Sequence, residues 1–299
     1  MKILLFGKNG QVGWELQRSL APLGQLIALG SNDTEYCGNL ADLSGIRQTI
    51  RNLAPNIIVN AAAYTAVDKA ETDSTLAHRL NAEAPGVIAQ EARNCNALLI
   101  HYSTDYVFDG AGNQAFVETD QTSPLNVYGQ SKLAGEKAIV DGGCAHFIFR
   151  TSWVYATYGN NFIKTILRLM LQKNELTIVD DQIGSPTGAE LIADVTAHAL
   201  CLYRHHPEHS GIYHLAARQY TSWYEYAQFI RTCTQNIRPS DAIATCKISP
   251  IPSTEFRLPA QRPLNSRLNT SKIEKNFDLT LPSWQSGVAR TLQEIFKKS

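Results

Sequence analysis

Short apolar runs alternate with longer amphipathic segments along the first 150 residues of the chain. The apolar runs are continuous, which is typical of strands buried on both faces of a parallel sheet. Five strands are predicted, at Lys2–Phe6, Gln25–Leu29, Asn56–Asn60, Ala97–His101 and His146–Arg150. Helices are predicted between them, at Val12–Leu20, Leu43–Leu53, Ser74–Asn94 and Tyr128–Val140. This order predicts an α/β fold with a doubly wound parallel sheet and right-handed crossovers.

The pattern becomes less regular after Arg150. Further helices are predicted at Asn161–Gln172, Ala189–Tyr203, Thr221–Thr232 and Trp284–Lys297. The segment Ile237–Arg267 contains five prolines and little periodicity, so we expect it to wrap a lobe without forming regular elements. The resulting division is a first domain of residues 1–152, extended by residues 188–218, and a smaller, discontinuous lobe of residues 153–187 and 219–299.

Composition narrows the function classes. The 27 lysine and arginine residues balance 27 aspartate and glutamate residues, so nothing indicates binding to nucleic acid or to an anionic membrane. The apolar run at the N-terminus is too short for a secretory signal, and no stretch is long enough to span a membrane. No C-x-x-C pair or zinc-like spacing occurs, which predicts reduced cysteines in a cytoplasmic protein, at Cys37, Cys95, Cys144, Cys201, Cys233 and Cys246.

A glycine-rich turn, Gly7-Lys8-Asn9-Gly10-Gln11-Val12-Gly13, follows the first predicted strand and begins a helix. Glycines allow a tight turn and let the backbone approach a pyrophosphate, while the helix N-terminus offers N–H donors. Glycines also mark ordinary turns, but the strand before this turn and the helix after it favour a dinucleotide site. The first domain is therefore predicted to be an NAD(P)-binding Rossmann domain.

The end of the second predicted strand bears on which dinucleotide binds. A carboxylate about 20 residues beyond the glycine turn normally holds the adenosine ribose, but this chain has Gly30, Ser31 and Asn32 there, with Asp33 slightly beyond. Without a carboxylate at the strand tip, a ribose 2′-phosphate meets less repulsion, so we expect NADPH to be used as readily as NADH. The small residues of Asn60–Tyr64 either begin a helix or pass beneath the cofactor. Their place at the carboxyl end of a parallel strand favours the cofactor.

Three side chains predict acid–base chemistry. Tyr128 and Lys132 lie one helical turn apart and share a face, and a nearby ammonium brings the pKa of a phenol closer to neutrality. Such a pair alone also occurs on exposed helices. Thr104, just past the fourth strand, adds a hydroxyl that could bond a carbonyl oxygen beside the phenol. Together they predict a site that protonates a developing alkoxide.

Motifs along nearly the whole chain resemble the extended short-chain dehydrogenase/reductase family, in the branch that acts on nucleotide-linked keto-sugars. They are S-T-D-Y-V-F-D-G at 103–110, P-L-N-V-Y-G-Q-S-K-L-A-G-E at 124–136 and R-T-S-W-V-Y at 150–155, with further matches at 160–162, 180–187, 211–215 and 262–269. The resemblance implies NAD(P)H-dependent reduction of a dTDP-linked 4-keto-6-deoxy sugar in dTDP-rhamnose biosynthesis.

The resemblance also implies residue roles. Tyr128 would donate the proton, Lys132 would hold the nicotinamide ribose, and Thr104 would contact the carbonyl. The expected cofactor contacts are Gly7, Gly10, Gln11, Val12, Gly13, Gly30, Asn39, Leu40, Ala63, Tyr64, Thr65, Tyr102, Tyr128 and Lys132, and the expected sugar contacts are Thr104, Asp105, Tyr128 and Trp153. Relatives often carry aspartate where this chain has Gly30, which leaves the choice between NADH and NADPH open.

Two sets of charged residues allow more than one interpretation. Arg262, Asn265 and Arg267 could pair with the substrate diphosphate or could be solvated. Glu190 and Asp194 share one helical face, as an ordinary acidic surface would. The resemblance implies instead that they and Glu15 bind a structural Mg²⁺ at a homodimer interface, which carboxylate oxygens suit.

Two alternative functions remain open. A nucleotide-sugar epimerase or dehydratase would retain NAD⁺, but dehydratases usually place an acidic pair beside the catalytic hydroxyl, whereas Asp105 and Tyr106 follow Thr104 here. A non-catalytic regulatory subunit, resembling the accessory subunit of methionine adenosyltransferase, need not retain threonine, tyrosine and lysine together.

Overall fold

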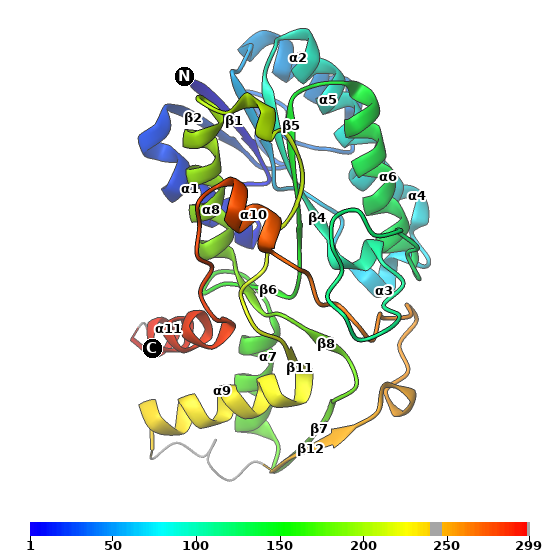
Figure 1. Ribbon diagram of the computed structural model, residues 1–299, viewed down its shortest axis with the longest axis vertical. Coiled ribbons are helices and arrows are strands. Elements are labelled where there is room, and N and C mark those ends of the chain that lie inside the picture. The colour runs from blue at the N-terminus through cyan, green and yellow to red at the C-terminus, as the bar shows by residue number, and fades with distance from the viewer. Residues whose placement is uncertain (240–246, 298–299) are drawn as a thin grey trace.

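A six-stranded parallel sheet lies at the centre of the protein, in the order β10-β5-β4-β3-β1-β2. The computed structural model describes residues 1–239 and 247–297 (Figure 1). The strands of this sheet are β1 (Lys2–Phe6), β2 (Gln25–Leu29), β3 (Ile57–Asn60), β4 (Leu98–Thr104), β5 (His146–Thr151) and β10 (Gly211–His214). The predicted doubly wound α/β class is confirmed, and the order reverses between β1 and β3.

Helices cover both faces of the sheet. On one face lie α1 (Gln11–Leu20) and α8 (Ala189–Tyr203), and on the other lie α2 (Leu43–Leu53), α5 (Ala84–Asn94) and α6 (Val127–Gly142) (Figure 1). Alternate residues of β1 serve the two layers, because Ile3 and Leu5 pack with the first pair of helices and Leu4 and Phe6 with the others. Continuous apolar strands are the expected result of burial on both sides.

The helix predicted over Ser74–Asn94 is present over its full length, in three consecutive parts. It consists of α4 (Ser74–His78), a π-helical turn (Arg79–Glu83) and α5. Pro85 lacks the N–H that a regular helix would direct at the carbonyl of Asn81. That carbonyl instead faces α6, where a Cβ on Gly135 would lie 2.0 Å from it. The predicted helix is therefore present over its whole range, and the π-helical turn within it lies where α6 packs closest.

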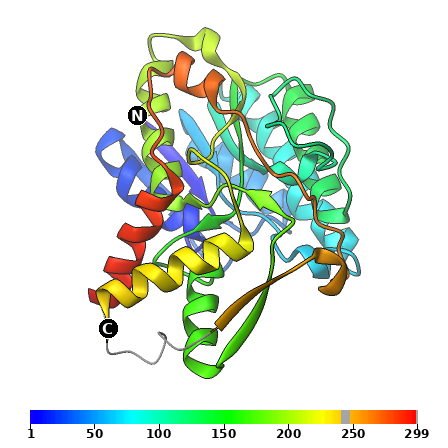
Figure 2. The ribbon, with the colours of Figure 1, turned by 60° about the horizontal axis from the view of Figure 1, so that its bottom comes forward.

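A separate core forms the lower half of the molecule in Figure 1. There α9 (Trp223–Ile237) packs against α7 (Phe162–Gln172) and α11 (Trp284–Lys297), as Figure 2 also shows. Buried side chains of these helices, among them Ile166, Tyr226 and Val288, form the core. The smaller elements of the described chain are α3 (Val67–Ala70), β6 (Val154–Tyr155), β7 (Glu175–Val179), β8 (Ile183–Gly184), β9 (Thr187–Gly188), β11 (Thr221–Ser222), β12 (Lys247–Ile251) and α10 (Ser271–Asn276).

The expectation that Ile237–Arg267 forms no regular element was wrong. β12 pairs in parallel with β7 and is followed by a 3₁₀ turn at Ser253–Glu255. The strand was not predicted because Pro250 lies within it. Proline is tolerated there because both strands of a two-stranded sheet are edge strands. The part of the segment at 240–246, including Cys246, lies outside the described residues. The other five cysteines are free thiols, and no helix within residues 1–239 or 247–297 is both long and apolar enough to cross a membrane.

A buried ion pair fixes α6 to the sheet. Arg150 of β5 donates to Glu136 of α6 through Nη2 at 2.7 Å and through Nε at 3.0 Å. Ser103 of β4 donates to the same carboxylate, and both charged side chains are almost fully buried. Three elements of the sheet and its helix layer therefore meet at one carboxylate.

We predict that Glu136→Gln destabilises the protein by about 3 kcal/mol or more, because it leaves a buried guanidinium without its counter-charge. Glu83→Gln is the control, since Glu83 forms an exposed pair with Arg79 at 3.7 Å and such pairs contribute less than about 1 kcal/mol. Urea denaturation measures both. Equal midpoints for the two variants would contradict the structural role of Glu136.

Candidate active site

A cleft of about 720 Å³ opens at the carboxyl ends of the sheet strands. Open α/β sheets bind ligands at this edge, next to the point where the strand order reverses. The lining residues include the glycine turn, the tips of β2 and β3, and the Tyr128–Lys132 face of α6. They are Gly7, Asn9, Gly10, Gln11, Val12, Gly30, Ser31, Gly38, Asn39, Leu40, Ala61, Ala62, Ala63, Thr65, Val67, Leu80, Tyr102, Ser103, Thr104, Asp105, Tyr106, Tyr128, Lys132, Thr151, Trp153, Val154 and Trp223.

The glycine turn has the geometry of a phosphate cradle. Gly7 has φ +89°, and a Cβ there would lie 2.5 Å from the backbone nitrogen of Ala62. A Cβ on Gly13 would lie 2.0 Å from the oxygen of Gly7, so this glycine packs α1 against the turn and does not line the cleft. Gly10 precedes α1 and has no side chain to cap the first N–H groups of the helix. These N–H groups could donate hydrogen bonds to a phosphate. The residues present therefore fit a dinucleotide.

The tip of β2 differs from the expectation, because a carboxylate does occupy it. Asp33 turns back and accepts a hydrogen bond from the backbone nitrogen of Gly30 at 2.5 Å. Lys8 of the glycine turn pairs with the same carboxylate at 2.7 Å, and its hydrogen bond lowers the pKa of Asp33. The loop after β2 thus brings in a charge that spacing along the chain did not reveal, together with a lysine that balances it.

Tyr128, Lys132 and Thr104 meet in the cleft as predicted. Asn126 caps α6 by accepting from the nitrogen of Gly129 at 2.8 Å, which begins the helix just before Tyr128. Burial raises the pKa of Tyr128 to about 12, a hydrogen bond with Thr104 opposes this rise, and the charge of Asp105 adds to it. The predicted lowering of the pKa of Tyr128 is therefore not present in the structure, because burial, which raises this pKa, has the largest effect.

Lys132 is almost fully buried, and burial lowers its pKa to about 8. Its amine donates to the carbonyl oxygen of Tyr102 at 2.6 Å and lies 3.2 Å from Nε2 of His101. The Tyr102 hydroxyl in turn contacts Thr196 of α8 at 2.8 Å. The amine is thus held against β4, one turn of α6 beyond the phenol.

The cleft lining also contains two stacked tryptophans. Trp153 has φ +47° and lies over Trp223 with ring centroids 3.6 Å apart. Sequence analysis missed Trp223, because a long stretch of chain separates it from the other residues of the cleft. Asp105 is buried beside Thr104, which donates to it at 3.0 Å, and burial raises the pKa of Asp105 to about 6.

Several expected contacts lie outside the cleft lining. The Tyr64 hydroxyl turns away to Asp73 at 3.3 Å. Arg262 forms a two-pronged pair with Asp68, with contacts of 2.8 and 2.7 Å. Asn265 donates to backbone carbonyls and accepts from Arg267 at 3.0 Å. A diphosphate role for Arg262, Asn265 and Arg267 therefore stays a prediction.

The three acidic residues predicted to bind Mg²⁺ line a second cavity of about 610 Å³. Each has an arginine partner within the chain. Arg18 contacts Asp194 at 2.8 Å and Glu15 at 3.5 Å, and Arg290 contacts Glu190 at 2.8 Å. The oxygen donors suit a hard cation, but a cation would compete with these arginines.

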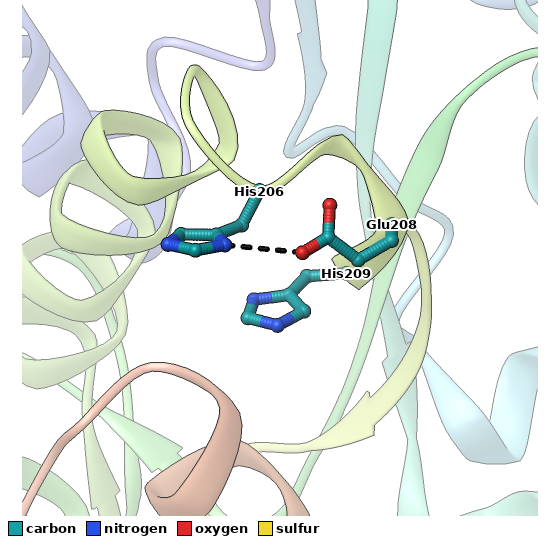
Figure 3. A group of neighbouring side chains, drawn as sticks. All are labelled: His206, Glu208 and His209. Atoms are coloured by element: carbon teal, nitrogen blue, oxygen red, sulfur yellow. Dashed lines mark hydrogen bonds and ion pairs between the residues drawn. The ribbon is translucent and has the colours of Figure 1, made fainter.

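A different group brings metal-ligand atoms together. Among the described residues, only His206, Glu208 and His209 have such atoms all within 4.8 Å of one another. Figure 3 shows them on the turn after α8, with Nδ1 of His206 pointing at the Glu208 carboxylate 3.0 Å away. This turn precedes β10 and so lies at the amino edge of the sheet, opposite the cleft.

The doubly wound sheet, the glycine cradle and the threonine–tyrosine–lysine set define an extended short-chain dehydrogenase/reductase. A family model described as "RmlD substrate binding domain" matches residues 1–296. The chain belongs to this family.

Its relatives include named reductases. A dTDP-4-dehydrorhamnose reductase from Shigella flexneri is 53% identical over 296 residues, which cover 99% of this chain and 98% of the relative. Two crystal structures of enzymes with the same name are also similar. The one from Clostridium acetobutylicum has a TM-score of 0.89 at 31% identity and covers 99% of this chain and 100% of its own. The one from Bacillus anthracis, in complex with NADP, has a TM-score of 0.86 at 33% identity, with 98% and 99% covered.

Proposed function

We propose that this protein reduces dTDP-4-dehydro-β-L-rhamnose to dTDP-L-rhamnose with NADPH or NADH, as the final step of dTDP-rhamnose biosynthesis. The observation that carries the proposal is that Thr104, Tyr128 and Lys132 line the same cleft as the glycine cradle. The names of the relatives at 53% identity support the choice of substrate.

Different residues of the cleft have different roles in the proposed reaction. When bound, the reduced nicotinamide supplies the hydride to the keto carbon. Thr104 and Tyr128 hold the keto oxygen, and the phenol proton passes to that oxygen as negative charge develops. Because burial raises the pKa of Tyr128 to about 12, the phenol is protonated at neutral pH and ready to donate. Lys132 then stands one helical turn away as the group that restores the phenol proton.

The alternative functions receive less support from the site. A dehydratase usually has an acidic pair beside the catalytic hydroxyl, whereas here a single acid, Asp105, and then Tyr106 follow Thr104. A non-catalytic regulatory subunit would not need a buried lysine beside a threonine and a tyrosine in the cleft. We also propose that residues 153–187 and 219–299 form the sugar-nucleotide lobe, since Trp153 and Trp223 both line the cleft.

We infer that the protein uses NADPH at least as well as NADH, because Lys8 balances the charge of Asp33. Asp33 would repel a ribose 2′-phosphate if it were alone, but Lys8 neutralises it and carries an ammonium within reach of the same loop. An ammonium is a good partner for phosphate oxygens. Selectivity for the cofactor then depends on the balance of this pair.

We further propose a homodimer with Mg²⁺ at its interface, formed by Glu15, Glu190 and Asp194. Clustered carboxylates repel unless cations compensate them, and the arginines that face them within the chain, Arg18 and Arg290, are both more than half exposed. The cytoplasm is the proposed location, which the five free thiols support.

The first prediction concerns the proton donor. Tyr128→Phe should lower turnover by roughly 10²-fold or more, because an acid–base group is lost, while NADPH binding stays near that of the wild type. Tyr203→Phe, at the far end of α8, is the control and should retain activity. Absorbance at 340 nm with NADPH and the dTDP-4-keto sugar follows the reaction. A Tyr128→Phe rate within about threefold of wild type would remove Tyr128 from the mechanism.

The second prediction concerns cofactor choice. Lys8→Met should lower kcat/KM for NADPH more than for NADH, because it leaves the Asp33 charge facing the 2′-phosphate. Asp33→Asn should act in the opposite direction, and Gly30→Asp should favour NADH. A Cβ at position 30 would make its one close contact with the end of the Asn9 side chain, at 2.7 Å. A wild-type kcat/KM about tenfold higher for NADH than for NADPH would refute the inference.

The third prediction concerns assembly. Sedimentation velocity in Mg²⁺ should show dimers that EDTA partly dissociates, and Glu15→Gln should weaken the dimer in Mg²⁺. Glu35→Gln, in the loop after β2, is the control. Identical monomer fractions in EDTA and Mg²⁺ would exclude the metal bridge and leave the reductase assignment intact.

A further inference from the structure

A buried line of side chains runs behind Lys132, away from the cleft. His101 of β4 and Asn60 of β3 are each 1% exposed. The amide nitrogen of Asn60 lies 3.1 Å from Nδ1 of His101, and Nε2 of His101 lies 3.2 Å from the amine of Lys132. The proposed reaction assigns no role to either residue.

The backbone fixes the direction of these hydrogen bonds. The N–H of Ala62 can only donate, and it points at the side-chain oxygen of Asn60 at 3.2 Å. The NH₂ group of Asn60 therefore faces His101, so Nδ1 of His101 must accept. A neutral imidazole carries its proton on one nitrogen only. His101 is thus in the tautomer with hydrogen on Nε2, the nitrogen that faces Lys132.

This tautomer discriminates between the two protonation states of Lys132. An ammonium has three N–H donors and no acceptor, so it would set an N–H against the N–H of His101. A neutral amine has a lone pair that can accept from Nε2 while it still donates to the carbonyl of Tyr102. Protonation of His101 would not remove this conflict, since both ring nitrogens would then carry hydrogen. It is also disfavoured, because burial and the adjacent Lys132 hold the pKa of His101 well below its usual range.

We propose that Asn60 and His101 are positioning residues that hold Lys132 against β4 and favour its neutral amine, so that Lys132 exchanges protons instead of remaining a fixed cation. The link to turnover rests on the proposed reductase function. In that reaction the phenol proton of Tyr128 goes to the substrate oxygen. The Lys132 ammonium is then the source of the proton that restores the phenol. Solvent restores the ammonium, so each proton is accounted for.

Other groups near Lys132 also bear on its charge. On its own helix, Glu136 favours the ammonium, whereas burial opposes it; Glu136 is itself paired with Arg150 of β5. From β4, the carbonyl of Tyr102 accepts from the Lys132 amine, and His101 faces it. Tyr128 and Asp105 line the same cleft. A carboxylate at residue 60 would change the His101 tautomer and would also attract the ammonium directly, so the two effects are separated in a His101→Phe background.

Asn60→Asp tests the tautomer with almost no change in shape. The carboxylate still accepts from Ala62, but it also accepts from Nδ1 of His101, so Nε2 turns a lone pair toward Lys132. The ammonium gains a partner, and a gained partner of this kind shifts a pKa upward by about one unit. Titration of lysine ¹³Cε resonances measures this shift directly. The Lys132 signal is assigned by its loss in Lys132→Met.

The expected result is a Lys132 midpoint about one pH unit higher in Asn60→Asp than in wild type, with the alkaline fall of kcat/KM for reduction displaced upward by the same amount. The displacement follows because reduction needs the ammonium, and a higher pKa preserves it to higher pH. In a His101→Phe background the same substitution should shift the midpoint much less. His214→Gln, which removes another buried imidazole, should leave the midpoint unchanged.

The wild-type protein provides a test that needs no variant. Long-range ¹H–¹⁵N spectra should show His101 as the neutral tautomer with hydrogen on Nε2 between about pH 6 and pH 8, where its lowered pKa keeps it uncharged. A proton on Nδ1, or an unshifted Lys132 midpoint in folded Asn60→Asp, would overturn the proposal. Neither measurement uses substrate, so a failure of the reductase assignment would be seen separately in the 340 nm assay.

Discussion

The close packing of α6 against the sheet is the constraint on which the site depends. A Cβ on Gly129 would lie 2.3 Å from the carbonyl oxygen of Tyr106, and one on Gly135 would lie 2.0 Å from that of Asn81. Between these contacts and the buried pair of Glu136 and Arg150, the helix has no freedom to rotate or slide. The phenol and the amine on its inner face therefore stand at set positions beside β4, as acid–base chemistry requires.

Burial then acts on the two groups in opposite senses. It disfavours whichever form is charged, so it keeps the phenol of Tyr128 neutral and makes the ammonium of Lys132 easier to deprotonate. A group that holds its proton firmly stands beside one that exchanges it near neutral pH. The same low-polarity surroundings thus act on both the proposed proton donor and its proposed source of replacement protons.

Periodicity and short motifs predicted the features that are determined by residues close together in the chain. β1 and β2 match the prediction residue for residue. For β1 the reason is burial on both faces, which leaves a continuous apolar run. Tyr128 and Lys132 were predicted from their helical spacing together with the place of Thr104 just past the fourth predicted strand, and the family resemblance implied their roles. What the sequence did not reveal depends on contacts between distant segments: the π-helical turn opposite Gly135, the strand through Pro250, the return of Asp33 to Gly30, and the stacking of Trp223 on Trp153. None of these has a local pattern.

The position of β10 has an evolutionary consequence. The strand completes the central sheet beside β5, yet in the chain it follows the segment that carries Trp153 and precedes the helix that carries Trp223. The segments that carry Trp153 and Trp223 are therefore encoded in separate stretches of the gene, with a strand of the central sheet between them. Recombination cannot exchange both segments as one cassette without also exchanging that strand.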